Sequence, residues 1–365
     1  MSKVYFTDMR TSFTENLPKK LTRLIDRAGL GTIDFDHKFV AIKIHFGEMG
    51  NLAYLRPQYA RALAAYIKER GGLPFLTDCN TLYVGSRKNA LEHIETAYIN
   101  GYTPYATGCQ VIIADGVRGT DEAYIPIGCE EVKTAKIGRA IADADIIISL
   151  NHFKGHEDAG FGGALKNLGM GSGSRAGKME MHYDGKPVVD RDRCRGCRKC
   201  ATICANDGIH YENSKAVIDH DNCVGCGRCI AICSFDAIKP HNSSSAASLN
   251  KRIAEYAYAV VKDKPNFHIS IAADISPNCD CHPENDAPIV PNIGMFASFD
   301  PVAIDLAAAD AVNAMPANPR SALSEAECRC HDHFINVHPN TNWRVQIEHG
   351  EEIGLGSSEY ELIRI

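Results

Sequence analysis

The run Asp145-Ile-Ile-Ile-Ser-Leu150 is mostly apolar and has the length of a β-strand. A strand that is apolar at consecutive positions, rather than at alternate ones, is typical of a sheet covered on both faces. Phe39–His45 has the same character, and Arg56–Arg70 follows it with apolar residues at helical spacing. This alternation of strands and helices predicts an α/β fold, in which a mainly parallel sheet is flanked by helices.

The same alternation continues on both sides of a cysteine-rich segment. Further strands are expected at Leu73–Thr77, Gln110–Ala114, Phe267–Asp274 and Gly294–Ser298, and further helices at Arg87–Tyr98, Ile137–Ala142, Leu249–Lys262 and Pro301–Val312. The C-terminal part alone has too few strands for a stable sheet, so we expect it to complete the sheet of the N-terminal part. The prediction is one discontinuous α/β domain, 1–185 and 243–365, with residues 186–242 inserted at a loop.

Length and composition restrict the class of protein. The 365 residues are 45% hydrophobic and 23% charged, which is typical of globular domains and excludes a largely disordered chain. The net charge of −6 argues against a general nucleic-acid binder, and no apolar run approaches the ~18 residues of a membrane span. The first residues lack the apolar core of a secretory signal. An odd total of 15 cysteines then points to metal ligands rather than disulfides, and to a soluble, cytoplasmic metalloprotein.

Eight of the cysteines form an internal repeat. The spacing Cys-x2-Cys-x2-Cys-x3-Cys occurs in 194–204 and again in 223–233. Positions between the cysteines match as well, which indicates a duplicated structural unit. Two-residue gaps let a tight loop place three thiolates around one cluster, and we expect the fourth cysteine of each run to start a short helix. Two structural zinc sites are the alternative, although zinc ribbons use paired Cys-x2-Cys rather than triplets with a trailing cysteine.

The repeat resembles the bacterial-type ferredoxins, α+β domains that carry two [4Fe-4S] clusters. The resemblance implies that the fourth cysteine of each run ligates the cluster of the other run. The implied ligand sets are Cys194, Cys197, Cys200 and Cys233 for one cluster, and Cys223, Cys226, Cys229 and Cys204 for the other. The proline that usually follows each fourth cysteine is replaced by Ala205 and Ser234, which removes no ligand.

The cysteine-rich segment holds more Lys and Arg than Asp and Glu, in contrast to the acidic chain as a whole. Its most basic run, 191–199, would lie beside the first cluster. Positive charge there would raise the cluster potential and could dock an acidic redox partner protein. Ordinary solvated charges are the alternative.

A glycine-rich stretch, residues 151–173, directly follows the strand quoted above. It also contains His152, Lys154, His156 and Lys166. Open α/β sheets bind ligands at the carboxyl ends of their strands, where glycines allow close approach of the backbone and cations offer charge-assisted donors. We therefore predict that these four residues bind or act on a small anionic ligand, a carboxylate or a phosphate. A mobile linker is the alternative, and the stretch lacks the spacing of a P-loop.

Several motifs resemble the family known as domain of unknown function 362. They are His-Phe-Lys-Gly-His at 152–156, Gly-Gly-Ala-Leu-Lys-Asn at 162–167, Cys-Asp-Cys at 279–281 and Ala-Ser-Phe-Asp-Pro-Val-Ala-Ile-Asp at 297–305. Together they cover both halves of the chain, which suits a member of that family with a ferredoxin insert. The name of the family assigns no activity to it.

The glycine-rich stretch is also similar to the loop His-x3-Gly-x2-Gly-Gly-x-Lys of the lactate racemase superfamily. The matching residues are His156, Gly160, Gly163 and Lys166, together with Arg56-Pro57 for the Arg-Pro of that superfamily. The glycine pair is shifted by one position and the downstream Pro-Gly is replaced. The resemblance implies that Lys166 tethers a nickel-pincer cofactor and that histidines transfer protons.

Near the C-terminus, the pattern Cys-x-Cys-His occurs twice. The four cysteines are Cys279 and Cys281 in the first copy, and Cys328 and Cys330 in the second. If the copies meet, their thiolates suit zinc, iron or another thiophilic metal, which predicts a third metal site or a thiolate-bound cofactor. Redox-active thiols and inert free thiols are the alternatives.

Together these features favour an iron–sulfur oxidoreductase whose two clusters relay electrons to a small anionic substrate or second cofactor in the α/β domain. A non-catalytic electron carrier or scaffold is one alternative, and a racemase- or transferase-like metal enzyme with structural clusters is another. No nicotinamide or flavin fingerprint occurs. The glycine-rich stretch discriminates between enzyme and carrier, because a carrier needs no ligand pocket. We expect Asp78 and Asp300 in the wall of that pocket.

Overall fold

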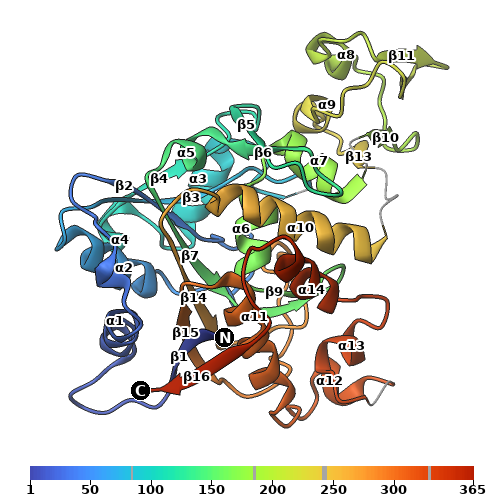
Figure 1. Cartoon of the computed structure of the whole chain (residues 1–365). Helices are drawn as coiled ribbons and strands as arrows, with labels where there is room; N and C mark the ends of the chain where they lie inside the picture. Colours follow the sequence, from blue (N-terminus) through green and yellow to red (C-terminus); the bar gives the residue numbers. More distant parts are fainter. Residues whose placement is uncertain (84, 184–185, 241–244, 328–329) are drawn as a thin grey trace.

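The computed structural model describes the chain except for residues 84, 184–185, 241–244 and 328–329. Its main sheet has eight strands (Figure 1). In spatial order they are β16 (Tyr360–Arg364), β1 (Ser2–Asp8), β15 (Gly294–Ser298), β14 (Asn266–Ala272), β7 (Ile146–His152), β2 (Phe39–Lys43), β3 (Leu73–Asp78) and β4 (Gln110–Ile113). β15 is antiparallel to both neighbours and the other pairings are parallel, so the predicted mainly parallel sheet is confirmed.

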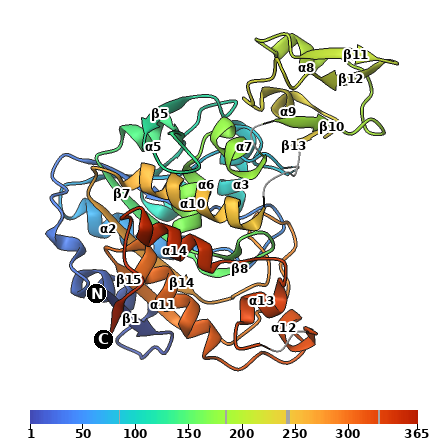
Figure 2. The ribbon, with the colours of Figure 1, turned by 45° about the vertical axis from the view of Figure 1, so that its right-hand side comes forward.

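Helices cover both faces of this sheet (Figures 1 and 2). One face carries α1 (Leu17–Arg27), α2 (Pro57–Lys68), α3 (Ala90–Ile99) and α4 (Pro104–Thr107), and the other carries α6 (Ala164–Ser172), α10 (Ala246–Val261), α11 (Pro301–Asn313) and α14 (Arg344–Glu352). The strand β7 shows why two layers are needed. Ile146 and Ile148 join the apolar core of the first face, whereas Ile147 joins that of the second. Alternate side chains of one strand thus fill two separate cores.

The remaining elements are short. Four two-stranded sheets pair β5 (Glu122–Pro126) with β6 (Thr134–Gly138), β8 (Lys154–His156) with β9 (Gly160–Gly162), β10 (Pro187–Val189) with β13 (Ile238–Pro240), and β11 (Ile209–Glu212) with β12 (Lys215–Ile218). The other helices are η1 (Leu30–Thr32), α5 (Arg139–Asp143), α7 (Arg175–Tyr183), α8 (Lys199–Ile203), α9 (Arg228–Ile232), α12 (Ala322–Glu325) and α13 (His333–Val337). Within the described parts of the chain, no helix combines the length and apolarity that a membrane crossing requires.

The cysteine-rich segment projects from the body beside α7 (Figures 1 and 2). It contains β10 to β13 with α8 and α9, and it has a small apolar core that includes Ala216, Ile230 and Ile238. Its first and last strands pair with each other, Pro187 opposite Pro240. The chain therefore enters and leaves this projection at one place.

Two local predictions are wrong. The helix expected from Ile137 begins only at Arg139, because Ile137 lies in β6 opposite Ala123. Cys204 and Cys233 do not start helices. Each follows one, since the turn before the third cysteine of each run already leads into α8 or α9, and the fourth cysteine is the C-cap.

Strands β1 and β16, of which β16 forms one edge of the sheet, are not among the strands expected from the sequence. The side chains of β16 are only half-buried or exposed, so its sequence lacks the continuous apolar character of the central strands. An edge strand with one free side needs less apolar sequence than a strand buried on both faces.

The glycine-rich stretch after β7 forms the β8–β9 hairpin and helix α6 rather than an open loop. Helix α6 packs directly on α10. A Cβ atom at Gly169 would lie 2.2 Å from the carbonyl oxygen of Ile253, so the absence of a side chain lets the two helices approach this closely. This contact holds α6, and with it the residues of its first turn, against the body of the domain.

Replacing Gly169 by Ala should therefore destabilise the protein. The overlap with the main chain of α10 should lower the free energy of unfolding by roughly 1–3 kcal/mol, even though Ala is the better helix former by about 1 kcal/mol. Anaerobic urea denaturation followed by circular dichroism measures the change. Gly162→Ala is the matched control, because its nearest contact would be an ordinary 3.6 Å. Equal stability of Gly169→Ala and wild type would contradict the close helix contact.

Candidate functional site

A pocket of about 790 Å³, mouth included, lies where β2, β3 and β7 end. Lys43 reaches it from the end of β2 and Asp78 from the end of β3. The structure brings the four residues predicted in the glycine-rich stretch into its wall: His152, Lys154, His156 and Lys166. The position agrees with the general rule for open α/β sheets.

Asp280 holds two of these four residues. Its fully buried carboxylate lies 2.9 Å from His152 Nδ1 and 3.0 Å from Lys154 Nζ. The other ring nitrogen of His152, Nε2, lies 2.8 Å from the carbonyl oxygen of Ala273. Burial alone would raise the pKa of Asp280, but His152 and Lys154 hold it below its usual range. His152 and Lys154 therefore serve mainly to anchor the loop that carries Asp280, a residue that the sequence analysis missed.

His156 and Lys166 converge instead on the thiol of Cys279. Lys166 Nζ lies 3.7 Å from Cys279 Sγ. His156 Nδ1 accepts hydrogen bonds from the main-chain N–H groups of Asp158 and Ala159, each at 3.1 Å, which leaves Nε2 as its donor toward the pocket. Hydrogen bonding from Cys281, together with Lys166 and His156, lowers the pKa of Cys279 well below its ordinary value despite burial.

Lys43 and Asp78 form a buried ion pair at 3.0 Å, and Lys43 Nζ also donates to Asn167 Oδ1 at 2.9 Å. Burial would raise the pKa of Asp78, but Lys43 and nearby histidines lower it. The expectation that Asp300 also lies in the pocket wall is wrong. Its carboxylate accepts from the main-chain N–H groups of Val302 and Ala303 and so caps α11.

Two further cations, Arg87 and Lys178, line the pocket and were not identified from the sequence. Arg87 Nε lies 2.9 Å from Glu48 Oε2, and Lys178 Nζ donates to the carbonyl oxygen of Gly173 at 2.6 Å. Only their charge marks them in the sequence, because tertiary packing alone brings them to the pocket. The basic residues of the wall are Lys43, Arg87, Lys154, Lys166 and Lys178, whereas its carboxylates are Asp78 and Glu157. Three of these cations are paired with carboxylates, Lys43 with Asp78, Arg87 with Glu48 and Lys154 with Asp280, whereas no carboxylate among the described residues pairs with Lys166 or Lys178, and these two suit an anionic ligand.

The projecting segment contains two smaller cavities, each lined by four cysteines. One, of about 340 Å³, is lined by Cys194, Cys197, Cys200 and Cys233, and the other, of about 370 Å³, by Cys204, Cys223, Cys226 and Cys229. In the first set, Cys233 comes from the second cysteine run, and in the second set, Cys204 comes from the first run. Main-chain N–H groups also point at sulfur: Ala216 N lies 3.4 Å from Cys194 Sγ, and Ala237 N lies 3.3 Å from Cys233 Sγ.

The second cysteine-lined cavity borders the body of the protein. Leu82, which lines the pocket, belongs to the same apolar cluster as Met179, Cys200 and Cys229. A Cβ atom at Gly227, in the wall of the second cavity, would lie 2.8 Å from the side chain of Arg175, so the two parts are in close contact there.

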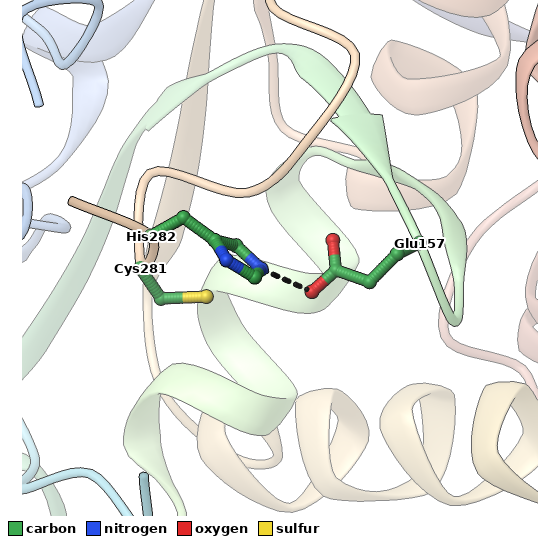
Figure 3. Close-up of side chains that lie close together, drawn as sticks. All are labelled: Glu157, Cys281 and His282. Carbon is green, nitrogen blue, oxygen red and sulfur yellow. Dashed lines mark hydrogen bonds and ion pairs between the residues drawn. The ribbon is translucent and has the colours of Figure 1, made fainter. Parts of the chain in front are cut away.

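The two Cys-x-Cys-His motifs lie in different surroundings. Cys279 and Cys281 line the pocket, where His282 Nε2 lies 2.9 Å from Glu157 Oε1 (Figure 3). Cys330 is exposed and its thiol donates to Asn336 Oδ1 at 3.0 Å, and it is not part of the described pocket wall. Cys328 lies outside the described residues. A metal site shared by the two motifs stays a prediction.

Comparisons with known proteins give one family and several solved structures. The family model described as "Domain of unknown function (DUF362)" matches residues 40–310. No curated protein matches the chain. The lactate racemase apoprotein from Thermoanaerobacterium thermosaccharolyticum matches with 10% identity and a TM-score of 0.37, over 75% of this chain and 51% of that one. A protein from Thermotoga maritima matches with 12% identity and a TM-score of 0.39, over 80% and 56%. The chain thus spans about half the length of these structures.

A carboxylate on α11 fixes the start of α6, and its titration is testable. Asp305 accepts from the N–H groups of Ala164 and Leu165 at 2.6 and 2.9 Å, and burial raises its pKa to about 7. Because the folded state holds this proton more tightly than the unfolded state, stability should fall as pH rises from about 4 to 7. Asp305→Asn should remove this dependence.

As pH falls from 7 to 5, the free energy of unfolding of the wild type should therefore rise relative to that of Asp305→Asn, by roughly 1 kcal/mol for each pH unit. Urea denaturation at several pH values measures it. Asp310→Asn, which changes an exposed carboxylate on the same helix, is the control. A difference that stays constant between pH 5 and 7 would show that Asp305 titrates like an ordinary aspartate.

Proposed function

The chain belongs to the DUF362 family, and we propose that it is an iron–sulfur oxidoreductase. In this proposal the cysteine-rich projection is a ferredoxin-type module with two [4Fe-4S] clusters. The pocket at the end of the sheet holds the small anionic ligand that exchanges electrons with them. The reduced thiols that cluster assembly needs suit the cytoplasm.

The residues of the projection fit such clusters. Each cavity offers four thiols and a largely apolar wall, and N–H groups directed at sulfur are the hydrogen bonds that tune cluster potentials. Gly196 and Gly225 have φ of +63° and +69°, a backbone conformation that favours glycine in the tight cysteine loops. When bound, the clusters would supply one-electron transfer. The basic run 191–199 remains the proposed docking surface for an acidic redox partner.

The observation that carries the proposal is the apolar contact between module and pocket. Leu82 lines the pocket and belongs to the same group of buried apolar side chains as Met179 and Cys229. The ion pair of Lys88 with Asp236, at 2.8 Å, adds a second link between body and module. A carrier that only meets other proteins has no need to place a pocket lined by several cations against its cysteine-rich module.

Within the pocket, we assign different roles to the cations, to His156 and to Asp280. Lys166 and Lys178 are positioned to bind an anion, since neither forms a direct ion pair with a carboxylate in the described part of the structure. His156 presents Nε2–H to the pocket and can donate a hydrogen bond to a bound group. Asp280 keeps the surrounding loop in place through His152 and Lys154.

The cluster assignment predicts iron content and pairing of variants. Anaerobically purified protein should hold roughly eight iron and eight sulfide per chain. Cys204→Ser and Cys226→Ser should change the same electron paramagnetic resonance signal, because Cys204 and Cys226 line one cavity. Cys200→Ser should change a different signal, because Cys200 lines the other cavity. Cys129→Ser, outside both cavities, is the control. If Cys204→Ser instead matches Cys200→Ser, the crossed ligation is wrong.

The pocket assignment predicts selective loss of anion binding. A panel of small carboxylates and phosphates should contain members that stabilise the wild-type protein, by about 2.7 kcal/mol at a hundredfold excess over Kd. Lys166→Met should abolish that stabilisation while the absorbance of both clusters is unchanged. The control is Lys3→Met, which changes an exposed lysine on β1. Thermal unfolding with and without each anion measures the effect. If Lys166→Met and wild type respond alike, the electron-carrier alternative replaces the enzyme.

A further inference from the structure

We propose that Glu157, Cys281 and His282 bind one divalent transition-metal ion of the zinc class at the rim of the pocket (Figure 3). The proposal goes beyond the electron relay, because it stands on these residues alone and needs no cluster. Glu157 comes from the turn between β8 and β9, and the other two residues come from the loop after β14. Two segments far apart in sequence thus bring three different ligand types together.

The donor atoms have the proximity that a single ion requires. A carboxylate oxygen of Glu157, the sulfur of Cys281 and a ring nitrogen of His282 all lie within 4.8 Å of one another. Glu157 and His282 are about one-third exposed, at 33% and 37%, so an ion can reach them from solvent. One sulfur, one nitrogen and one oxygen ligand suit zinc and exclude magnesium or calcium, which take oxygen ligands.

The imidazole of His282 is oriented as in known metal sites. Its Nε2 faces Glu157, while its Nδ1 lies 3.4 Å from Glu284 Oε1 on the opposite side of the ring. Histidine ligands of metals commonly donate their second N–H to a carboxylate, which fixes the tautomer and the ring plane. Glu284 is therefore a positioning residue for the ligand His282.

The competing arrangement, in which His156 binds the ion with Glu157 and Asp158, is disfavoured by hydrogen bonding. His156 Nδ1 already accepts from two main-chain N–H groups, so that nitrogen has no lone pair left for a metal. Its Nε2 is then the protonated nitrogen, which cannot bind a metal without losing its proton.

The position of the site defines its chemical use. Glu157 and Cys281 line the pocket, and Cys279 with Lys166 is adjacent. Three protein ligands leave one tetrahedral position for a ligand atom from the pocket, as in catalytic rather than structural zinc sites. An ion held here would bind an oxygen atom of the same anion that Lys166 attracts.

Zinc binding to the complete, cluster-loaded protein tests the proposal without an activity assay. Holoprotein equilibrated with buffered zinc should retain about one equivalent by mass spectrometry of the elements. X-ray absorption at the zinc edge should show one sulfur and otherwise nitrogen or oxygen ligands, and this signal is separate from that of iron. His282→Ala and Cys281→Ala should weaken zinc binding by more than about tenfold, and Glu284→Gln by about tenfold.

Cys330→Ala is the matched control, because it changes the other Cys-x-Cys-His motif, and it should bind zinc like wild type. Iron and sulfide content should be the same in all variants, which separates this site from the proposed clusters. Glu157→Gln provides a second ligand variant of nearly identical shape if an alanine variant fails to fold. Three results would each overturn the proposal: no zinc retained by wild type, zinc surrounded by four sulfurs, or equal zinc affinity in the wild-type and ligand variants.

Discussion

Asp280 carries a fully buried carboxylate, and the arrangement of the pocket depends on its contacts with His152 and Lys154. The main chain on either side of it carries Cys279 and Cys281, so these two contacts set where both thiols lie relative to β7 and the β8–β9 hairpin. Removal of one partner from such a buried pair typically costs about 3–5 kcal/mol, because a charge is left without compensation. Movement of the loop would separate Asp280 from His152 and Lys154 and leave buried charges without partners. The two thiols therefore stay near Lys166.

The central part of the fold could be predicted from the sequence because burial leaves a strong local signal. Asp145–Leu150 is apolar at consecutive positions, and the structure shows its side chains filling a core on each face. The edge strand β16 gives no such signal, since half-buried positions tolerate Glu and Arg. The apolar neighbours of Ile137 suit a helix as well as a strand, and only its pairing with Ala123 decides for the strand.

The candidate site could be located but not fully interpreted from the sequence. Glycines and cations after a buried strand indicate where a pocket forms, because strand ends meet at one edge of a parallel sheet. The sequence could not show that Asp280 engages His152 and Lys154, since 128 residues separate Asp280 from His152. Glu157 is similar: its neighbours in sequence do not reveal that His282 lies beside it. Motifs report which chemistry is available, and tertiary contacts decide which groups stay free to use it.

The pairing of β10 with β13 has a consequence for how this chain can vary. Because Pro187 and Pro240 face each other, the polypeptide leaves and rejoins the body through a single narrow stem. The segment beyond a stem can be lengthened, shortened or exchanged without moving the strands of the main sheet, since their spacing does not depend on it. A change of length within the cysteine-rich segment therefore leaves the main sheet in place, and only the side-chain contacts between the segment and the body, such as Lys88 with Asp236, would have to adapt.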